Sequence, residues 1–356
     1  MIEGLRRNGV EVVECHEPLW FSIEDRVKVA SGGWKHPSFW IRVVKTYAHL
    51  LWKYRRIGDY DVMVLGYPGQ PDVPLARVLT WLRRKPLVLD MFMSIYLIAQ
   101  ERGLTERNPL TAHLIYFLEK LACSLPDLLI IDTQEYMAWF QQTYGIPSCR
   151  FRLVPTGADD RVFHPVSLEK KDGLFRVLYY GSFIPNHGVT YIIEAARILR
   201  DDPNIHFELI GDGPEKPYAM ALAHQYNLTN VTFEDWMDQD ELARRASSAD
   251  VILGAFGTTP QSLMTVQNKI YEGLAMGKPV ITGDSKAVRE TLPDQAVYLC
   301  ARADPLSLAE GIRFLKENEA ARNRIGSNGK IVFYEKYTPT HIGAVFKRIL
   351  KELIFV

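Results

Sequence analysis

A glycine-containing turn in the second half of the sequence has residue types that can bind a phosphate group. An apolar strand at 175–180 breaks at Gly181, continues through Ser182, and enters a helix near His187 and Gly188. Such a turn directs backbone N–H groups and the positive end of a helix toward a ligand. His187 could add a cationic or hydrogen-bonding contact to a diphosphate. The alternatives are an ordinary strand-to-helix turn and a histidine that only caps the helix.

A second turn, Gly211-Asp212-Gly213-Pro214, follows the next predicted strand at 205–210 and also opens a helix. The carboxyl ends of neighbouring parallel strands lie at the same edge of a sheet, which is where open α/β sheets bind ligands. This turn is weak evidence by itself, but the two turns together favour a nucleotide site.

A predicted helix near 266–276 carries Lys269 and Glu272 close to its start and runs through Gly277 into a buried strand. A lysine at this place suits a phosphate, and a carboxylate suits the hydroxyl groups of a ribose. In the alternative interpretation the two residues are a solvated ion pair three positions apart on a helix.

The elements that would position these residues alternate between strands and helices along the chain, which is typical of parallel sheets. In the first half we expect a helix at 1–8, strands at 11–15, 60–65, 86–90 and 127–132, and helices near 38–56, 72–84, 108–124 and 133–143. In the second half we expect strands at 175–180, 205–210, 230–234, 250–253, 279–282 and 296–299, and helices near 187–200, 215–227, 238–248, 266–276, 285–291, 305–317 and 338–353. The turn-rich segment at 153–172 predicts a linker between two domains.

The composition limits the class of protein. A length of 356 residues suggests two domains, and 42 basic against 42 acidic residues leave no overall field that would attract nucleic acid. The four cysteines form no C-x-x-C pair, which argues against a zinc site or a disulfide framework. The sequence starts without a signal-peptide pattern and contains no run of about 18 apolar residues. These features predict a cytoplasmic protein.

Together these motifs resemble the family-4 glycosyltransferases of the GT-B class, which have two Rossmann-like domains. The resemblance covers about residues 125–345 and rests on the two glycine turns, on Asn268 to Pro279, and on Val154 to Asp159 with Phe163 and Pro165. It implies an α/β fold with two parallel sheets that face a central cleft. The implied domains are an acceptor domain at 1–155 with the tail 338–356, a nucleotide-sugar domain at 166–337, and a linker at 153–172.

The resemblance also implies roles for individual residues. Glu272 would bind the ribose of a nucleotide-diphosphate-sugar, and Lys269 and the loop of Gly181 would lie beside the diphosphate. The whole donor-binding set implied in this way is Gly181, Ser182, His187, Gly188, Gly211, Asn268, Lys269, Glu272 and Leu274. The family usually transfers sugars with retention, without a cofactor or an obligatory metal ion. Backbone dipoles and cationic side chains must then stabilise the departing diphosphate, with the donor phosphate as the base.

Three features depart from the family pattern. Met264 stands where the family places a glutamate that contacts the transferred sugar. Ser182 and His187 replace an arginine and a lysine, which leaves fewer positive charges at the diphosphate. The chain begins in a helix, so the N-terminal domain lacks the family's first strand and glycine-rich loop. We expect either that the chain start is truncated or that the strand has been lost with reduced activity.

In the first half, Asp90 ends a predicted strand and is the candidate catalytic residue, although Leu89 stands where relatives have a histidine. The pattern Asp59-Tyr60-Asp61 has the form of a metal-nucleotide motif, but it lies at the entrance of a strand. A helix-to-strand turn is therefore the better interpretation of it.

Residues 34–56 hold six basic residues, several aromatic residues and no acidic residue. Such a segment can lie on an anionic membrane, which would suit an enzyme with a lipid-linked acceptor. In the alternative, a helix with a basic outer face turns the apolar stripe Ile41, Val44, Ala48 and Leu51 toward the core.

We therefore predict a cytoplasmic glycosyltransferase, peripheral at the inner face of the cell membrane, that acts in polysaccharide or glycolipid assembly. Its partners would be a nucleotide-sugar and a glycan or lipid-linked acceptor. The alternatives are a nucleotide-sugar-binding partner subunit without activity, favoured by Met264 and Ser182, and a GT-B epimerase that acts on the nucleotide-sugar itself.

Overall fold

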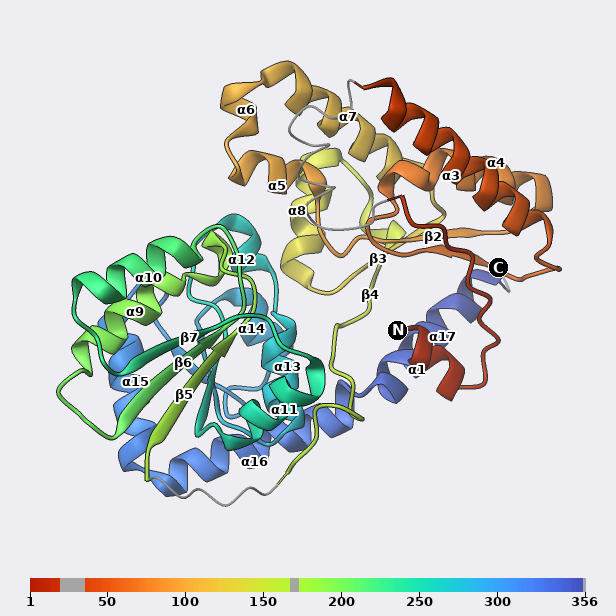
Figure 1. The fold of residues 1–356 in the computed structure, drawn as a ribbon. Coiled ribbons are helices and arrows are strands. Elements are labelled where there is room, and N and C mark those ends of the chain that lie inside the picture. The colour runs from red at the N-terminus through yellow and green to blue at the C-terminus, as the bar shows by residue number, and fades with distance from the viewer. Residues whose placement is uncertain (20–35, 167–172, 355–356) are drawn as a thin grey trace.

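The computed structural model describes residues 1–19, 36–166 and 173–354. These residues form two α/β domains, each built on a parallel sheet (Figure 1). The first sheet has four strands in the order β1-β2-β3-β4, and the second has six in the order β10-β9-β8-β5-β6-β7. The predicted class, two parallel-sheet domains, is confirmed.

The second domain is wound on both faces of its sheet. Its strands are β5 (Phe175–Tyr180), β6 (Ile205–Ile210), β7 (Val231–Glu234), β8 (Val251–Leu253), β9 (Val280–Gly283) and β10 (Tyr298–Cys300). Alternate residues of β5 pack into different cores, so that Val177 and Tyr179 face one side and Leu178 and Tyr180 face the other. Burial on both faces explains why these strands are continuous apolar runs.

Helices cover both faces of this sheet. One core includes α9 (Val189–Ile198), α10 (Lys216–Gln225) and α15 (Pro305–Glu317), and the other includes α11 (Gln239–Ser248), α13 (Asn268–Ala275), α14 (Lys286–Thr291) and α16 (Glu319–Lys336). Short helices η4 (Pro185–His187) and α12 (Pro260–Met264) lie in the connections. The sequence did not predict α16, because Gly326 and Gly329 interrupt its apolar pattern. Both glycines are buried, and a Cβ atom at Gly326 would collide with the carbonyl of Gly277, which lies between α13 and β9.

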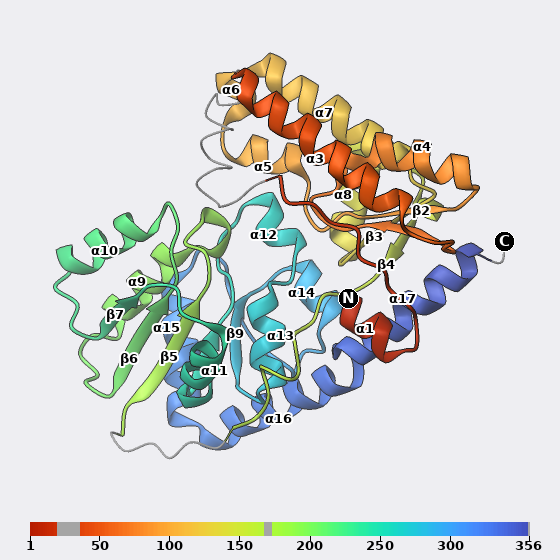
Figure 2. The ribbon, with the colours of Figure 1, turned by 45° about the vertical axis from the view of Figure 1, so that its right-hand side comes forward.

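The first domain is wound on one face only. Its strands β1 (Met63–Leu65), β2 (Leu87–Asp90), β3 (Leu128–Ile131) and β4 (Phe151–Leu153) follow one another in sequence order and are all parallel. Right-handed crossovers between consecutive strands place every connecting helix on the same face. The helices of these connections are η2 (Gln70–Asp72), α4 (Val73–Arg83), α5 (Ile95–Glu101), α6 (Leu104–Arg107), α7 (Pro109–Ser124), α8 (Gln134–Tyr144) and η3 (Ser148–Arg150) (Figure 2). Helix α3 (Pro37–Arg55) precedes β1 in the chain and does not connect two strands of this sheet.

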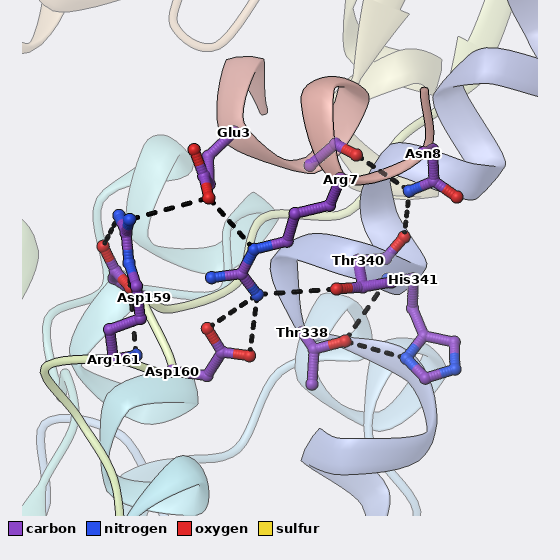
Figure 3. A network of polar contacts seen from close by, with 10 residues as sticks. Glu3, Arg7, Asn8, Asp159, Asp160, Arg161, Thr338, Thr340 and His341 are labelled. Carbon is purple, nitrogen blue, oxygen red and sulfur yellow. Dashed lines mark hydrogen bonds and ion pairs between the residues drawn. The ribbon is translucent and has the colours of Figure 1, made fainter. Parts of the chain in front are cut away.

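The two ends of the chain cover the opposite face of the first sheet. Leu5 of α1 (Ile2–Arg7) and Phe346 of α17 (Pro339–Ile354) share a buried cluster with Val88 and Ile130 of the sheet. The side chain of Asn8 donates to the Thr340 carbonyl at 2.8 Å, and nearby Arg7 Nη1 donates to both carboxylate oxygens of Asp160 at 3.0 Å (Figure 3). The C-terminal helix therefore completes the first domain.

The chain passes between the domains twice, and the two passages touch. The first follows β4, and the second joins α16 to α17. Gly157 in the first lies against Tyr337 in the second, so closely that a Cβ atom at Gly157 would collide with the Tyr337 carbonyl.

The predicted strand at 11–15 does not form. Among the described residues no strand lies beside this segment, so its backbone cannot enter the sheet, although Val10 and Val12 still pack against the cluster beneath α17. Within the described chain the first strand is β1, at one edge of the sheet. Residues 34–35 of the basic segment and 167–172 of the predicted linker lie outside the described residues.

The close approach of α1 and α17 gives a stability prediction. A Cβ atom at Gly343 would collide with the Gly4 carbonyl, so Gly343→Ala should lower the free energy of unfolding by about 1–3 kcal/mol. Gly58→Ala is the matched control, because nothing lies within 4 Å of its Cβ position. Equal urea midpoints for the two variants would contradict the packing described here.

Candidate functional site

The carboxyl ends of β5 and β6 approach each other through two glycines. Gly181 and Gly211 have φ angles of 140° and 129°, which L side chains rarely adopt. A Cβ atom at Gly211 would collide with the Gly181 carbonyl, and the Gly181 amide donates to the Ile210 carbonyl at 3.0 Å. The two predicted turns therefore meet at one edge of the sheet.

The loop after Gly181 leaves a backbone donor available. The Phe183 amide donates to the Asp212 carbonyl at 2.9 Å, which ties this loop to the second turn. The Ser182 amide donates to none of the described residues, and Ser182 is partly exposed. Gly188 ends η4 and precedes α9, whose N-terminus follows this loop. An anion beside Ser182 would meet an amide and a helix dipole.

Lys269 brings a buried cation to this loop. Its side chain is 5% exposed, and its Nζ lies 4.1 Å from the ring centroid of Tyr179 and 3.4 Å from His187 Nδ1. A Cβ atom at Gly181 would lie 2.8 Å from the same Nζ. Burial lowers the pKa of Lys269 to about 7, against the opposing effect of Glu272. An anion beside the ammonium would restore its ordinary charge.

His187 is neutral in this arrangement. Burial, together with the neighbouring Lys269, holds the pKa of His187 well below its ordinary value. Its Nδ1 lies 2.6 Å from the Ser182 carbonyl, which can only accept a hydrogen bond, so Nδ1 carries the proton. The Tyr179 hydroxyl donates to the same carbonyl at 2.8 Å. His187 thus fixes the loop, and the positive charge of the site comes from Lys269.

Glu272 lies one helical turn after Lys269 on α13, as its spacing predicts. Burial raises the pKa of Glu272, and a hydrogen bond with Tyr180 partly offsets this effect. Asn268 is the exposed first residue of the helix. Leu274 is fully buried in the core against α16, so its side chain is apart from this group. Its predicted donor contact stays a prediction, as do the roles of the other residues.

Met264 joins the second domain to the first. Its backbone carbonyl accepts a hydrogen bond from Thr133 Oγ1 at 2.5 Å, and its side chain packs against the core of the first domain. Beside it, Lys286 forms an ion pair with Glu135 at 2.6 Å. The position where the family has a sugar-contacting glutamate is therefore a contact between domains.

Two carboxyl groups lie at the carboxyl ends of neighbouring strands in the first domain. Asp90 ends β2 in register with Ile130 of β3, and Asp132 follows β3 directly before Thr133. Burial raises the pKa of Asp90 to about 6 and that of Asp132 to about 7, and Asp90 adds to the shift of Asp132. Asp132 Oδ1 is buried without a hydrogen-bond partner in the described structure.

Sequence reasoning identifies Asp90 as a candidate site residue but misses Asp132. The available signal is the same for both, an acidic residue at the end of a predicted buried strand. The described residues contain no group of three or more histidine, cysteine or acidic side chains arranged to hold a metal ion. Asp59 forms an ion pair with Lys85 at 3.0 Å before β1, in keeping with a helix-to-strand turn.

Comparisons with known proteins show that the chain is similar to glycosyltransferases. Residues 160–332 match the model of the family "Glycosyl transferases group 1". The lipopolysaccharide core biosynthesis glycosyltransferase LpsD of Rhizobium meliloti is 25% identical over 222 residues, which are 61% of this chain and 60% of LpsD. The matches span 43% to 60% of the length of the curated relatives. They support the prediction of a glycosyltransferase enzyme.

Solved structures share the fold of the chain. Sucrose-phosphate synthase from Thermosynechococcus elongatus has a TM-score of 0.69 at 19% identity, over 89% of this chain and 79% of that one. HepE from Anabaena, in complex with UDP, has a TM-score of 0.65 at 16% identity, over 82% of this chain and 79% of that one. The chain has the GT-B fold.

The buried Asp132 gives a pH-dependent prediction. The raised pKa means that the unfolded chain ionises first, so the stability cost is absent below about pH 4 and complete above about pH 7. Asp132→Asn should therefore raise the free energy of unfolding at pH 8, by at most about 4 kcal/mol, and leave it unchanged at pH 4. Asp201→Asn, at an exposed carboxylate, is the control. A gain that is equal at both pH values would refute the assignment.

Proposed function

We propose that this chain, with a GT-B fold and a match to glycosyl transferases group 1, transfers a sugar from a nucleotide-diphosphate-sugar to a glycan or lipid-linked acceptor. The observation that carries the proposal is the buried Lys269 ammonium beside the loop of Gly181. Among the described residues its Nζ contacts the Tyr179 ring at 4.1 Å and His187 Nδ1 at 3.4 Å, and neither group is an anion. A buried cation without a paired anion is expensive, and a bound diphosphate would supply that anion.

The geometry supports a division of roles within the donor site. The Ser182 amide, the start of α9 and Lys269 would hold the diphosphate and stabilise its charge as it departs. Glu272, one turn further on α13, would accept hydrogen bonds from the ribose. Lys269 supplies positive charge at the diphosphate, and we propose that neither a cofactor nor an obligatory metal ion is needed.

The transfer we propose is of the family-4 kind, with retention. The bond between the sugar carbon and the donor phosphate breaks, and a bond from the same carbon to an acceptor oxygen forms on the same face. The acceptor hydroxyl gives its proton to the departing phosphate. Asp90 and Asp132, at the strand ends of the first domain, would then bind acceptor hydroxyl groups.

The relatives indicate where to begin the search for substrates. LpsD is named for lipopolysaccharide core biosynthesis, and HepE was solved with UDP and with UDP-glucose. We therefore propose a uridine diphosphate sugar as the donor to test first, and a lipid-linked saccharide as the acceptor.

A second candidate function is that of a nucleotide-sugar-binding partner subunit without activity. Met264 favours it, because the position of the family's glutamate is engaged with Thr133 and the core of the first domain. Turnover of a panel of nucleotide-sugars, measured with thermal shift by the free nucleotides, separates the two functions. We expect both a thermal shift with the free nucleotides and slow release of the nucleoside diphosphate from its sugar. A shift without turnover supports the partner subunit, and a 2-epimer product would indicate an epimerase instead.

Removal of the buried ammonium tests the donor site directly. Lys269→Met should weaken binding of the nucleoside diphosphate about 10- to 100-fold at pH 6.5, which is below the pKa of about 7 that burial gives the lysine. The unliganded variant should be no less stable, because the substitution removes a buried charge. Lys336→Met, at an exposed lysine, should bind as the native chain does. Equal affinity of all three proteins by calorimetry would place the nucleotide elsewhere.

A further inference from the structure

Helix α7 turns an apolar stripe to the outside of the first domain. Five of its side chains at helical spacing are exposed, namely Leu110, Leu114, Phe117, Leu118 and Leu121, and Leu110 is 85% exposed. Its acidic residue, Glu119, is buried on the opposite face, where it accepts hydrogen bonds from Ser94 Oγ and the Tyr144 hydroxyl at 2.6 and 2.7 Å. This pattern is the reverse of the one expected for a solvated surface helix.

Helices α3 and α4 repeat the pattern. On α4, Val78, Trp81 and Leu82 are exposed, and Leu82 is 78% exposed. On α3, Tyr54 is the one buried residue of nineteen, and the exposed residues include Trp40, Ile41, Val44 and Trp52. The stripe of Ile41, Val44 and Ala48 thus faces outward, and the alternative in which it packs into the core is wrong. Leu51, the fourth member, is only partly buried.

The three helices lie together on one side of the first domain, away from the second domain (Figures 1 and 2). Arg83 of α4 donates to the Gly58 carbonyl after α3 at 2.7 Å and stacks on Tyr54 with 4.6 Å to the ring centroid. Tyr47 of α3 bonds to Asp72 at 2.5 Å, immediately before α4, and η2 packs against α7. These contacts tie α3, α4 and the neighbourhood of α7 together, and we call the exposed residues of the three helices the three-helix face.

The charge of the three-helix face has one sign. Glu119 is the only acidic residue in the three helices, and it is buried. The exposed basic residues in or directly after them are Lys45, Arg55, Arg56, Arg84 and Lys120. Nearby carboxylates pair with other cations, Glu17 with Lys53, Asp127 with Arg77 and Asp59 with Lys85.

We propose that the three-helix face docks on an anionic lipid surface. Exposed tryptophan, phenylalanine and leucine side chains can enter the boundary between headgroups and acyl chains, while lysine and arginine contact anionic headgroups. Two copies of this face would repel each other, which favours lipid over a second copy as the occupant. None of the described helices has the length and apolar content to cross a bilayer. The proposal does not depend on sugar transfer.

The test uses the full chain and vesicle flotation. The chain should float with vesicles of phosphatidylcholine and phosphatidylglycerol at 7:3, and at least tenfold less with phosphatidylcholine alone or in high salt. The triple variant Leu110→Gln, Leu114→Gln, Leu118→Gln should bind the anionic vesicles at least tenfold more weakly. A matched triple variant at exposed residues of the second domain, Tyr218→Gln, Met220→Gln, Trp236→Gln, should bind as the native chain does.

Each other outcome overturns the proposal. Absence of flotation with anionic vesicles refutes it, and so does binding that the α7 variant leaves unchanged. If vesicles are not bound and light scattering shows a dimer that the α7 variant dissociates, the face is an interface between copies. Unfolding midpoints of the native chain and both variants, which should agree because the substituted residues are exposed, confirm that folded proteins are compared.

Discussion

The candidate site depends on one amino group, that of Lys269, which is buried beside the Gly181 loop and whose pKa burial lowers to about 7. Because Gly181 has no side chain, there is room for this group beside the loop, and the ring of Tyr179 faces it. Desolvation acts on every nearby titratable group, so His187 is neutral and the pKa of Glu272 is raised. A bound anion would favour the charged form of Lys269 and raise its pKa again.

Much of this arrangement could be predicted from the sequence. The glycine turns and the Lys269–Glu272 spacing depend on short-range geometry, namely where a strand ends and how a helix turns, and such geometry is local in the sequence. The parallel strands of the second domain are apolar runs bounded by turns, which identifies them for the same reason.

Other features depended on contacts between distant residues. The segment at 11–15 has the composition of a strand, but a strand forms only where another strand lies beside it. Helix α16 could not be recognised, because Gly326 and Gly329 interrupt its apolar pattern, and the close packing that requires these glycines involves residues distant in the sequence. The direction of the stripe on α3 could not be predicted either, since the spacing of Ile41, Val44 and Ala48 shows only that they share a face, and the fold decides whether that face meets the core or the outside.

The contact between Gly157 and Tyr337 has a mechanical consequence for the whole molecule. Both segments that connect the two domains are in contact at this one place, so it is the natural hinge between the domains. A rotation that parts the strand ends of the two sheets would turn about this point. It would break the contacts of Thr133 with Met264 and of Glu135 with Lys286, and would leave the packing of α17 on the first domain intact.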